Sequence, residues 1–423
     1  MTIFDILDKK RKGFELSSEE IQYFVNGFVA GNIEEAQMSA LLMAICINGM
    51  NRKEVLCLTQ TMATSGNVIN LSSLYENGEN LCVDKHSSGG VSDTTTFVIA
   101  GILASAGVKM VKMSGKSLGF TGGTADKVAS FTGYQNEKTI DEAIYIAKKC
   151  NVSLITQSVS IVPADKKIYS LRDRTGTVQS IPLIASSIMS KKIASGSGIL
   201  LLDVKCGNGA FMENLKEAQL LAETMVKLGN DAGIKTAAFV TDMNEPLGAT
   251  VGNVLEAREA VQILKNEKEG RLKDLCVEES AWLISEAKKI SIEQAKIIAF
   301  NNIQNGKAYS SFKKIVEAHS GIIPDFKVSD YVVNVLSDEN GFVSEFKTRK
   351  IGELARFINE SCYNGGLEFF VKLGSKVKKG DLLAKIYVSK ELNSTKISDE
   401  LKDLIVISSK TKKHKLIYKI ITK

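Results

Sequence analysis

The sequence predicts an α/β protein with a small all-helical domain at its start and an α+β region at its end. Between residues 81 and 241, short apolar runs alternate with apolar helical stretches, and several of the runs end in glycine-rich loops. This alternation is typical of a mixed, mainly parallel sheet covered by helices. The chain has 423 residues, which is too many for one ordinary domain, so two or three domains are expected.

A helical bundle is expected over the first 66 residues. Ser17 and Glu20 form a capping-box pattern before an apolar stripe with helical spacing, and Gly31 is placed to end that helix. Two further helices are expected at 34–47 and 51–66. The apolar stripes of these helices would form the core of the bundle.

The remaining elements follow from the period and length of the apolar pattern. In the α/β part, strands are expected at 81–83, 108–113, 152–156, 199–205 and 236–241, and helices at 95–107, 140–150, 181–194, 215–228 and across 253–325. From about Phe326 the pattern turns to alternating strands. Residues 367–386 look like the hammerhead hairpin of biotinyl and lipoyl domains, but they lack the exposed Met-Lys turn that carries those cofactors.

Two glycine-rich loops, at 84–96 and 114–126, are the most informative stretches. Each sets glycines among hydroxyl side chains, with a lysine close by. Glycine lets backbone N–H groups approach an anion, Ser and Thr add donors, and a helix that begins after the loop offers its N-terminal amides. Both loops fall at the carboxyl ends of expected strands, where ligands bind in parallel sheets. We therefore expect one phosphate to be held between the two loops.

Composition and charge exclude several classes of function. The net charge of +6 is spread along the chain rather than gathered in a stripe, which disfavours nucleic acid as a partner. Seven cysteines without a CxxC motif fit reduced thiols in the cytosol, and three histidines are too few for a multi-His metal site. The sequence has neither a signal peptide nor an apolar run of roughly 18 residues, so we expect a cytoplasmic protein without a membrane partner.

Five blocks of this chain, in order, resemble pyrimidine-nucleoside phosphorylases and thymidine phosphorylases. They are DKHSSGGV at 84–91, residues 114–115 with 121–127, 172–173 with 180–183, 203–205 with 207 and 209–212, and 242–244 with 246–248. A single glycine loop would be weak evidence, whereas five separate blocks make a strong signal.

The resemblance implies reversible phosphorolysis of uridine, deoxyuridine or thymidine. Inorganic phosphate, as co-substrate, attacks C1′ and expels the base, which leaves a (deoxy)ribose 1-phosphate; no organic cofactor is implied. One part of the site must hold a phosphate dianion beside C1′. Another must stabilise the negative charge that builds on the departing pyrimidine.

The resemblance also carries site residues to this sequence. The implied phosphate ligands are Lys85, Ser87, Thr96, Ser114 and Thr124. The implied catalytic and base-binding residues are His86, Arg172, Ser187 and Lys191. Arg172 and Lys191 would supply positive charge near the ring oxygens, and His86 would bond or protonate the ring at O2. Lys112 stands where members that accept uridine tend to carry lysine, which favours broad pyrimidine specificity.

Some bacterial members bind a monovalent cation, usually K⁺, largely through backbone oxygens. The matching positions here are Ser92, Thr94, Leu247, Thr250 and Glu259. The family is dimeric through its helical domain, so a homodimer is expected. The implied division is a helical domain at 1–66 with a returning segment at 163–195, an α/β phosphate-binding domain at 67–162 and 196–330, and a C-terminal α+β region at 331–423. Closure of the first two domains would bring phosphate to C1′.

This chain departs from the family at six positions. The family usually has Gly at Ser92, Arg-Gly at Lys116 and Ser117, His at Phe120, Glu at Ala129 and an apolar residue at Arg174, where the arginine would add charge near the base site. These changes bear on substrate preference and turnover. Two alternatives stay open: a glycosyl transferase like anthranilate phosphoribosyltransferase, which uses a ribosyl diphosphate with Mg²⁺, and a non-catalytic nucleoside-binding homologue.

Overall fold

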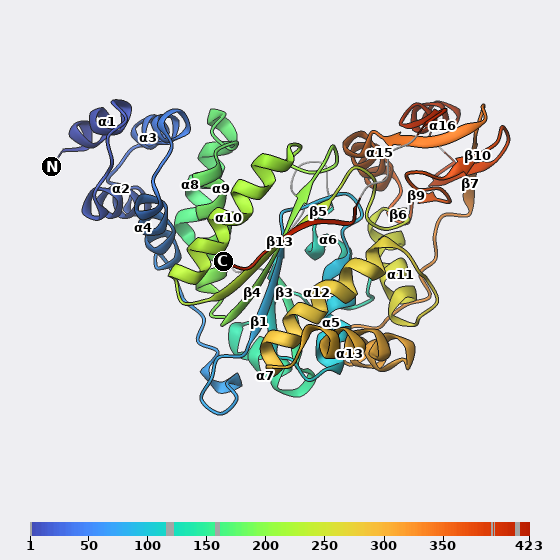
Figure 1. The fold of residues 1–423 in the computed structure, drawn as a ribbon, viewed down its shortest axis with the longest axis horizontal. Helices are drawn as coiled ribbons and strands as arrows, with labels where there is room; N and C mark the ends of the chain where they lie inside the picture. Colours follow the sequence, from blue (N-terminus) through green and yellow to red (C-terminus); the bar gives the residue numbers. More distant parts are fainter. Residues whose placement is uncertain (1, 116–121, 157–160, 391, 393, 411–414) are drawn as a thin grey trace.

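The computed structural model describes residues 2–115, 122–156, 161–390, 392, 394–410 and 415–423. A group of helices, a central α/β part and a C-terminal α+β part follow one another along the long axis of the molecule (Figure 1). The predicted fold class is confirmed.

Six helices make up the helical part, and two of them come from a distant segment of the chain. They are α1 (Ile3–Arg11), α2 (Ser18–Ala30), α3 (Glu35–Asn48), α4 (Arg52–Ala63), α8 (Pro163–Thr175) and α9 (Ile181–Ala194). All six contribute to one apolar core or pack on it, because Ile168, Leu171 and Leu183 join the side chains of the first four helices. The returning helices thus sit between the bundle and the sheet (Figure 1).

The predicted capping box of α2 is confirmed. The backbone N–H of Glu20 donates to Ser17 Oγ at 3.3 Å, and that of Ser17 donates to the Glu20 carboxylate at 2.6 Å. Gly31 ends the helix with φ of 84°, a conformation that glycine adopts without strain. The sequence interpretation had no helix at α1, which Thr2 caps through a hydrogen bond from the Asp5 N–H.

The central sheet is mixed and mainly parallel. Strands β1 (Val83–Ser87), β4 (Ile199–Cys206) and β5 (Lys235–Asp242) are parallel neighbours in that order, and β13 (Ile417–Ile421) is antiparallel to β5. β2 (Met110–Ser114) and β3 (Val152–Thr156) form a second parallel pair. Strand β4 is buried along its whole length, since Leu200 and Leu202 pack on one core and Leu201 on the other.

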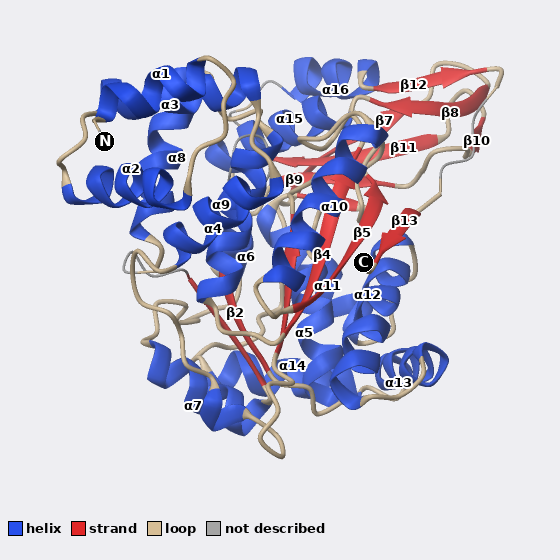
Figure 2. Cartoon of the chain, turned by 60° about the vertical axis from the view of Figure 1, so that its left-hand side comes forward, coloured by secondary structure: helices blue, strands red, loops and turns tan. Residues whose placement is uncertain are grey.

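Helices cover both faces of this sheet (Figure 2). They are α5 (Thr95–Ser105), α6 (Thr124–Val128), α7 (Ile140–Cys150), α10 (Leu215–Asp231), α11 (Asn253–Leu264), α12 (Arg271–Lys288), α13 (Ile292–Gln304) and α14 (Lys307–Ala318), with a short 3₁₀ turn at Ser72–Leu74. Among the described residues, no helix is both long enough and apolar enough to cross a membrane.

The C-terminal part contains two helices as well as strands. Its elements are β6 (Thr250–Val251), β7 (Tyr331–Leu336), β8 (Gly341–Phe346), α15 (Thr348–Ser361), β9 (Gly366–Phe369), β10 (Lys376–Val377), β11 (Leu382–Val388), α16 (Ser394–Asp403) and β12 (Ile405–Ser408). The sheets run β6-β9-β11-β7 and β10-β8-β12. The expected α+β character of this part is confirmed, although the sequence pattern after Phe326 indicated only strands and placed neither helix. The likeness of 367–386 to a hammerhead hairpin stays a prediction.

Two strands cross the expected boundary at residue 331. β6 precedes the boundary in sequence but pairs with β9, and β13 follows it but pairs with β5 of the central sheet. Tyr418 of β13 also donates to Asp242 Oδ1 at 2.5 Å. The last strand of the chain thus closes the edge of the central sheet and fastens the C-terminal part to it.

A substitution at Gly198, which directly precedes β4, tests how closely the backbone around this strand is packed. A Cβ on this residue would lie 2.0 Å from the carbonyl oxygen of Asn80, which is backbone and cannot swing away. We expect Gly198→Ala to lower the free energy of unfolding by about 3 kcal/mol in urea titrations. Gly31→Ala is the matched control, because φ is positive there but the space is open, so it should cost only about 1 kcal/mol. Equal costs would contradict this packing.

Candidate active site

Strand β1 sends alternate side chains to two charged clusters. On one face, Asp84 pairs with Lys192 of α9 at 2.8 Å and lies 3.8 Å from Lys112 of β2. His86 shares this face, close enough to Lys192, Lys112 and Lys191 for their charges to act on its ring. We call these five residues the lysine face. The lysine face connects α9, which packs with the helical part, to the central sheet.

The lysine face keeps His86 neutral. Burial lowers the pKa of His86 well below its ordinary value, and repulsion by Lys192, Lys112 and Lys191 lowers it further. A neutral imidazole carries one N–H. His86 can therefore donate a hydrogen bond to an oxygen of a pyrimidine ring at neutral pH, but it has no second ring proton to transfer.

Lys112 responds to the same surroundings. Burial and repulsion by Lys192 lower the pKa of Lys112 to about 7, with Asp84 opposing the shift. Its ammonium group is therefore only partly charged at neutral pH, and Nζ lies 3.3 Å from the Met113 carbonyl.

The other predicted base-site residues lie on α8 and α9. Lys191 Nζ donates to Asp165 Oδ2 at 2.7 Å, which fixes the ammonium group between the two helices. Ser187, one turn earlier on α9, is buried. Arg172 is buried too, and three of its N–H groups donate to the carbonyl oxygens of Thr177, Val178 and Leu183. Arg172 thus orders the connection between the two helices.

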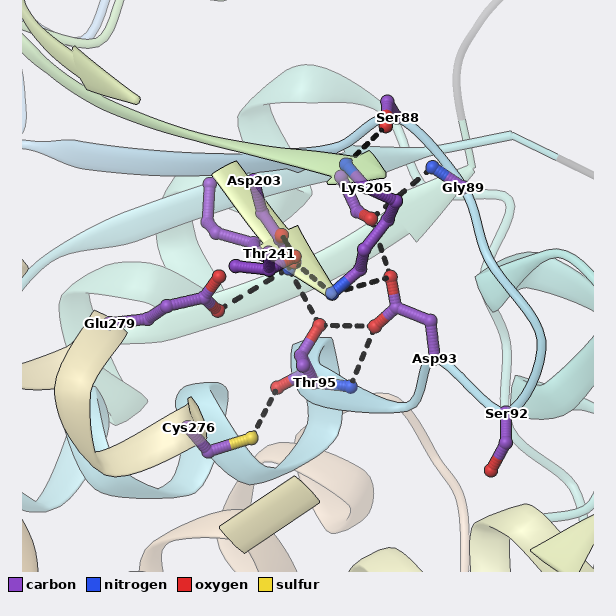
Figure 3. Close-up of polar contacts among 12 residues, drawn as sticks. Ser88, Gly89, Ser92, Asp93, Thr95, Asp203, Lys205, Thr241, Cys276 and Glu279 are labelled. Atoms are coloured by element: carbon purple, nitrogen blue, oxygen red, sulfur yellow. Dashed lines mark hydrogen bonds and ion pairs between the residues drawn. The ribbon is translucent and has the colours of Figure 1, made fainter. Parts of the chain in front are cut away.

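On its other face, β1 contributes to a buried ion cluster beneath the first glycine loop (Figure 3). The members of this Asp203 cluster are Lys85, Asp93, Thr95, Asp203, Lys205 and Glu279. Lys85 Nζ donates to Thr95 Oγ1 at 2.6 Å and to Asp203 Oδ2 at 3.0 Å, and Lys205 Nζ lies 2.5 Å from the same oxygen. Lys85, a predicted phosphate ligand, is therefore anchored from below.

The cluster fixes the shape of the first loop. Asp93 Oδ2 accepts from Ser87 Oγ at 2.5 Å, and Asp93 Oδ1 accepts from the hydroxyl and the N–H of Thr95, the first residue of α5. Burial alone would raise the pKa of Asp93, but Lys205 and Lys85 hold it below its ordinary value. The loop and the helix N-terminus are thus held together by an ionised carboxylate.

Glu279 of α12 lies at one side of the Asp203 cluster, on the left of Figure 3. Its Oε2 is 3.4 Å from Lys85 Nζ, and the side chain is fully buried. Burial and the neighbouring Asp203 carboxylate raise the pKa of Glu279 well above its ordinary value, and Lys85 and Lys205 oppose this shift. The Asp203 cluster thus sets two lysines beside three carboxyl groups.

The second loop is tied to the first through Lys127 of α6. Its Nζ donates to the Asp93 carbonyl at 3.0 Å and pairs with Glu256 of α11 at 2.7 Å. Among the predicted phosphate ligands, Thr124 begins α6, Thr96 lies in the first turn of α5, and Ser114 ends β2. Among the described residues, the buried hydroxyl of Ser114 has no hydrogen-bond partner.

The departures from the family fall in different surroundings. Lys116, Ser117 and Phe120 lie outside the described residues. Ala129 is exposed at the end of α6. Arg174 was expected to add charge near the base site, and this is wrong: its Nη2 donates at 2.8 Å to Glu35 of α3, and both side chains are more than half exposed.

Residues that the sequence interpretation left without a role hold the site together. They are Asp84, Asp93, Asp165, Lys192, Asp203, Lys205 and Glu279. Two of them, Asp203 and Lys205, lie at the end of a strand whose sequence predicts burial on both sides. Because buried charges are rarely kept without partners, this position was a signal in the sequence for a buried ion cluster. Asp84 and Asp93 also lie within the first glycine loop.

The five positions implied for a monovalent cation lie in neighbouring segments, but some of their oxygens already accept hydrogen bonds from within the chain. Glu259 accepts three hydrogen bonds from residues 249 and 250, and the Thr250 carbonyl accepts one from Ser92. Leu247 is joined to the same turn through its N–H. The Thr94 hydroxyl, in contrast, is buried without a partner. The donor set therefore fits a cation poorly.

Comparison with known families decides what kind of protein carries this site. The glycosyl transferase family, a/b domain, matches residues 79–309, and the helical bundle domain of the same family matches 4–66. The pyrimidine nucleoside phosphorylase C-terminal domain matches 342–408. The chain belongs to the pyrimidine-nucleoside phosphorylase family.

Relatives agree along the whole chain. A pyrimidine-nucleoside phosphorylase of Geobacillus stearothermophilus is 43% identical and covers 92% of this chain and 93% of its own. One of Bacillus subtilis is 42% identical and covers both chains completely. Anthranilate phosphoribosyltransferase from Thermus thermophilus shares the fold, with a TM-score of 0.61, 16% identity, and coverage of 75% of this chain and 99% of that one. The family resemblance predicted from sequence is confirmed.

The pKa of Lys112 gives a test of the lysine face. In the unfolded chain this lysine holds its proton up to its ordinary pKa of 10.5, and in the folded protein only up to about 7. Between these values the unfolded chain binds more protons, so the cost of Lys112 is full below pH 7 and fades as pH rises. Lys112→Met should raise the free energy of unfolding by a few kcal/mol near pH 6 and by about 1 kcal/mol near pH 9.5. Urea titrations at both pH values check this, and an equal gain at both would contradict it.

Proposed function

We propose that this chain catalyses the reversible phosphorolysis of pyrimidine nucleosides, with uridine, deoxyuridine and thymidine as substrates and inorganic phosphate as co-substrate. The observation that carries the proposal is that β1 contributes to two clusters. Its Lys85 and Ser87 face the Asp203 cluster beneath the first loop, and its His86 lies on the lysine face opposite. Full-length relatives named for this activity support it. The likeness to anthranilate phosphoribosyltransferase is one of fold alone.

The phosphate side of the proposed reaction uses the first and second loops. Ser87, Thr96, Ser114 and Thr124 are proposed to donate hydroxyl hydrogen bonds to phosphate, and Lys85 to supply positive charge beneath it. An oxygen of the dianion then attacks C1′ of the nucleoside. Because Lys85 is already held by Asp203 and Thr95, its charge needs no reorganisation when phosphate arrives.

The base side of the proposed reaction uses the lysine face. As the bond between C1′ and the ring nitrogen breaks, its electron pair moves into the pyrimidine. Lys191 and Arg172 are proposed to stabilise this charge, Ser187 to bond the ring, and His86 to donate an N–H hydrogen bond to O2. Lys112 is proposed to give the site broad pyrimidine specificity, so that uridine is accepted as well as thymidine.

The same proposal includes the domain division given by the sequence, with the cleft between the helical and α/β domains closing over substrate. Lys192 and Asp84 would sit at this junction, since their ion pair connects α9 with β1. A cytoplasmic location and the absence of nucleic-acid or membrane partners belong to the proposal as well.

Release of free uracil from uridine and phosphate tests the activity directly. We expect His86→Ala and Lys191→Ala to lower kcat by ~10²-fold or more, because each acts on the departing base. Lys227→Ala, which removes an exposed lysine on α10, is the control and should keep the wild-type rate. If the wild type released no base from uridine, deoxyuridine or thymidine, the non-catalytic alternative would stand instead.

We also propose that the chain is a homodimer through its helical part. Large apolar side chains are exposed there, with Phe4 at 75%, Phe14 at 60% and Ile47 at 74% of full exposure. Such a group of apolar side chains supports an interface between copies.

Sedimentation velocity checks the dimer. The double variant Phe14→Glu with Ile47→Glu should sediment as a monomer, because the charges would be buried unpaired in the interface. Phe357→Glu, at a 51% exposed site on α15, should leave the dimer intact. A monomeric wild type, or a dimer that survives the double variant, would rule this interface out.

A further inference from the structure

The turn that carries Ser92 is packed against the segment at residues 247–250. Ser92 is 2% exposed and adopts a φ of 62°, a left-handed conformation that is uncommon for a residue with a side chain. Its side chain points away from the Asp203 cluster, although Asp93 beside it is a member (Figure 3). The Ser92 hydroxyl therefore serves a separate set of contacts.

Those contacts tie two parts of the backbone together. Ser92 Oγ donates to the Thr250 carbonyl oxygen at 2.5 Å and accepts from the Gly248 N–H at 3.1 Å. The Leu247 N–H adds a third link, to the Val91 carbonyl at 3.1 Å. A neutral hydroxyl thus joins the first loop to the segment that follows β5.

The Glu259 carboxylate, which contacts the same segment, also has its hydrogen-bond partners within the chain. Its Oε1 accepts from the Ala249 N–H at 2.8 Å, and its Oε2 accepts from the N–H and the hydroxyl of Thr250 at 2.9 and 2.6 Å. Lys268 places its ammonium group 3.9 Å from Oε1. The carboxylate therefore has hydrogen bonds to both oxygens and a positive charge beside it.

The Ser92 hydroxyl and the Glu259 carboxylate lie against the same glycine. An atom placed where a Cβ of Gly248 would be lies 2.6 Å from Ser92 Oγ and 2.8 Å from Glu259 Oε2. A bound K⁺ needs several oxygens that converge on it with free lone pairs. Here hydrogen bonds already take up one lone pair of the Thr250 carbonyl and three acceptor sites of the Glu259 carboxylate, and the hydroxymethyl group of Ser92 stands beside that carbonyl.

We propose that the Ser92 hydroxyl takes over the structural role of the monovalent cation that the family resemblance implies, so that this chain holds its first loop in place without K⁺. The hydroxyl bridges the same turn and the same segment that a cation at the five matching positions would bridge. Lys268 supplies the positive charge for Glu259. The unpartnered Thr94 hydroxyl is then left for a water molecule or a substrate oxygen.

The test compares K⁺ with tetramethylammonium at equal ionic strength, using desalted full-length protein. For the wild type, Tm without substrate should differ by less than about 1 °C between the two salts, and the rate of base release by less than about 2-fold. Ser92→Gly should fold, because glycine suits the positive φ, and K⁺ should then raise its Tm by about 3 °C or more through binding to the vacated space. Its rate should rise with K⁺ by ~5-fold or more.

Ser92→Ala is the matched control, because it keeps the Cβ and removes only the hydroxyl. It should have a lower Tm than the wild type in both salts and should not respond to K⁺. A wild-type Tm that depends on K⁺ would overturn the proposal, and so would a Ser92→Gly variant that ignores K⁺. The rate measurements rest on the proposed phosphorolysis, whereas the Tm measurements do not, so a failure of the function and a failure of this inference are told apart.

Discussion

The Asp203 carboxylate makes the contacts on which the first glycine loop depends. It lies in the middle of the central sheet, pairs with Lys85 and Lys205, and accepts a hydrogen bond from Thr241 at 2.6 Å. A buried ion costs several kcal/mol unless its partners are close and well placed. Removing either Lys85 or Lys205 would leave the carboxyl groups of the Asp203 cluster with a single lysine among them. The cluster fixes the loop geometry at a cost in stability that a purely apolar core would avoid.

The period of a β-strand separates the two halves of the chemistry. Asp84 and His86 face the lysines of α9 and β2, while Lys85 and Ser87 face the Asp203 cluster. Four consecutive residues of one strand thus reach both the Asp203 cluster and the lysine face, which are the proposed sites for phosphate and for the departing base. Strand β1 pairs with β4 in register, Lys85 beside Leu201 and Ser87 beside Asp203, so a slip by one residue would exchange the two faces.

The sequence predicted local structure better than it predicted charge partners. The expected bounds of α7, β3 and α9 agree with the structure, because period and capping are local signals. Lys85 and Asp203 are 118 residues apart, and no pattern in either segment names the other. Arg174 was misplaced because two residues along a helix turn a side chain by about 200°, to the face opposite Arg172. Helix α15 was missed although Ile351, Leu354, Ala355 and Ile358 have helical spacing.

A neutral His86 explains how the lysine face can favour the transition state of the proposed reaction over the bound substrate. The field of three lysines and the surrounding burial keep the imidazole unprotonated while the nucleoside is neutral. Negative charge that develops on the pyrimidine opposes this field and makes an N–H hydrogen bond from His86 stronger. The same charge is attracted by Lys191 at the moment the bond to C1′ breaks. Both gains are small in the ground state, and an interaction that grows only as charge develops raises kcat rather than merely tightening binding.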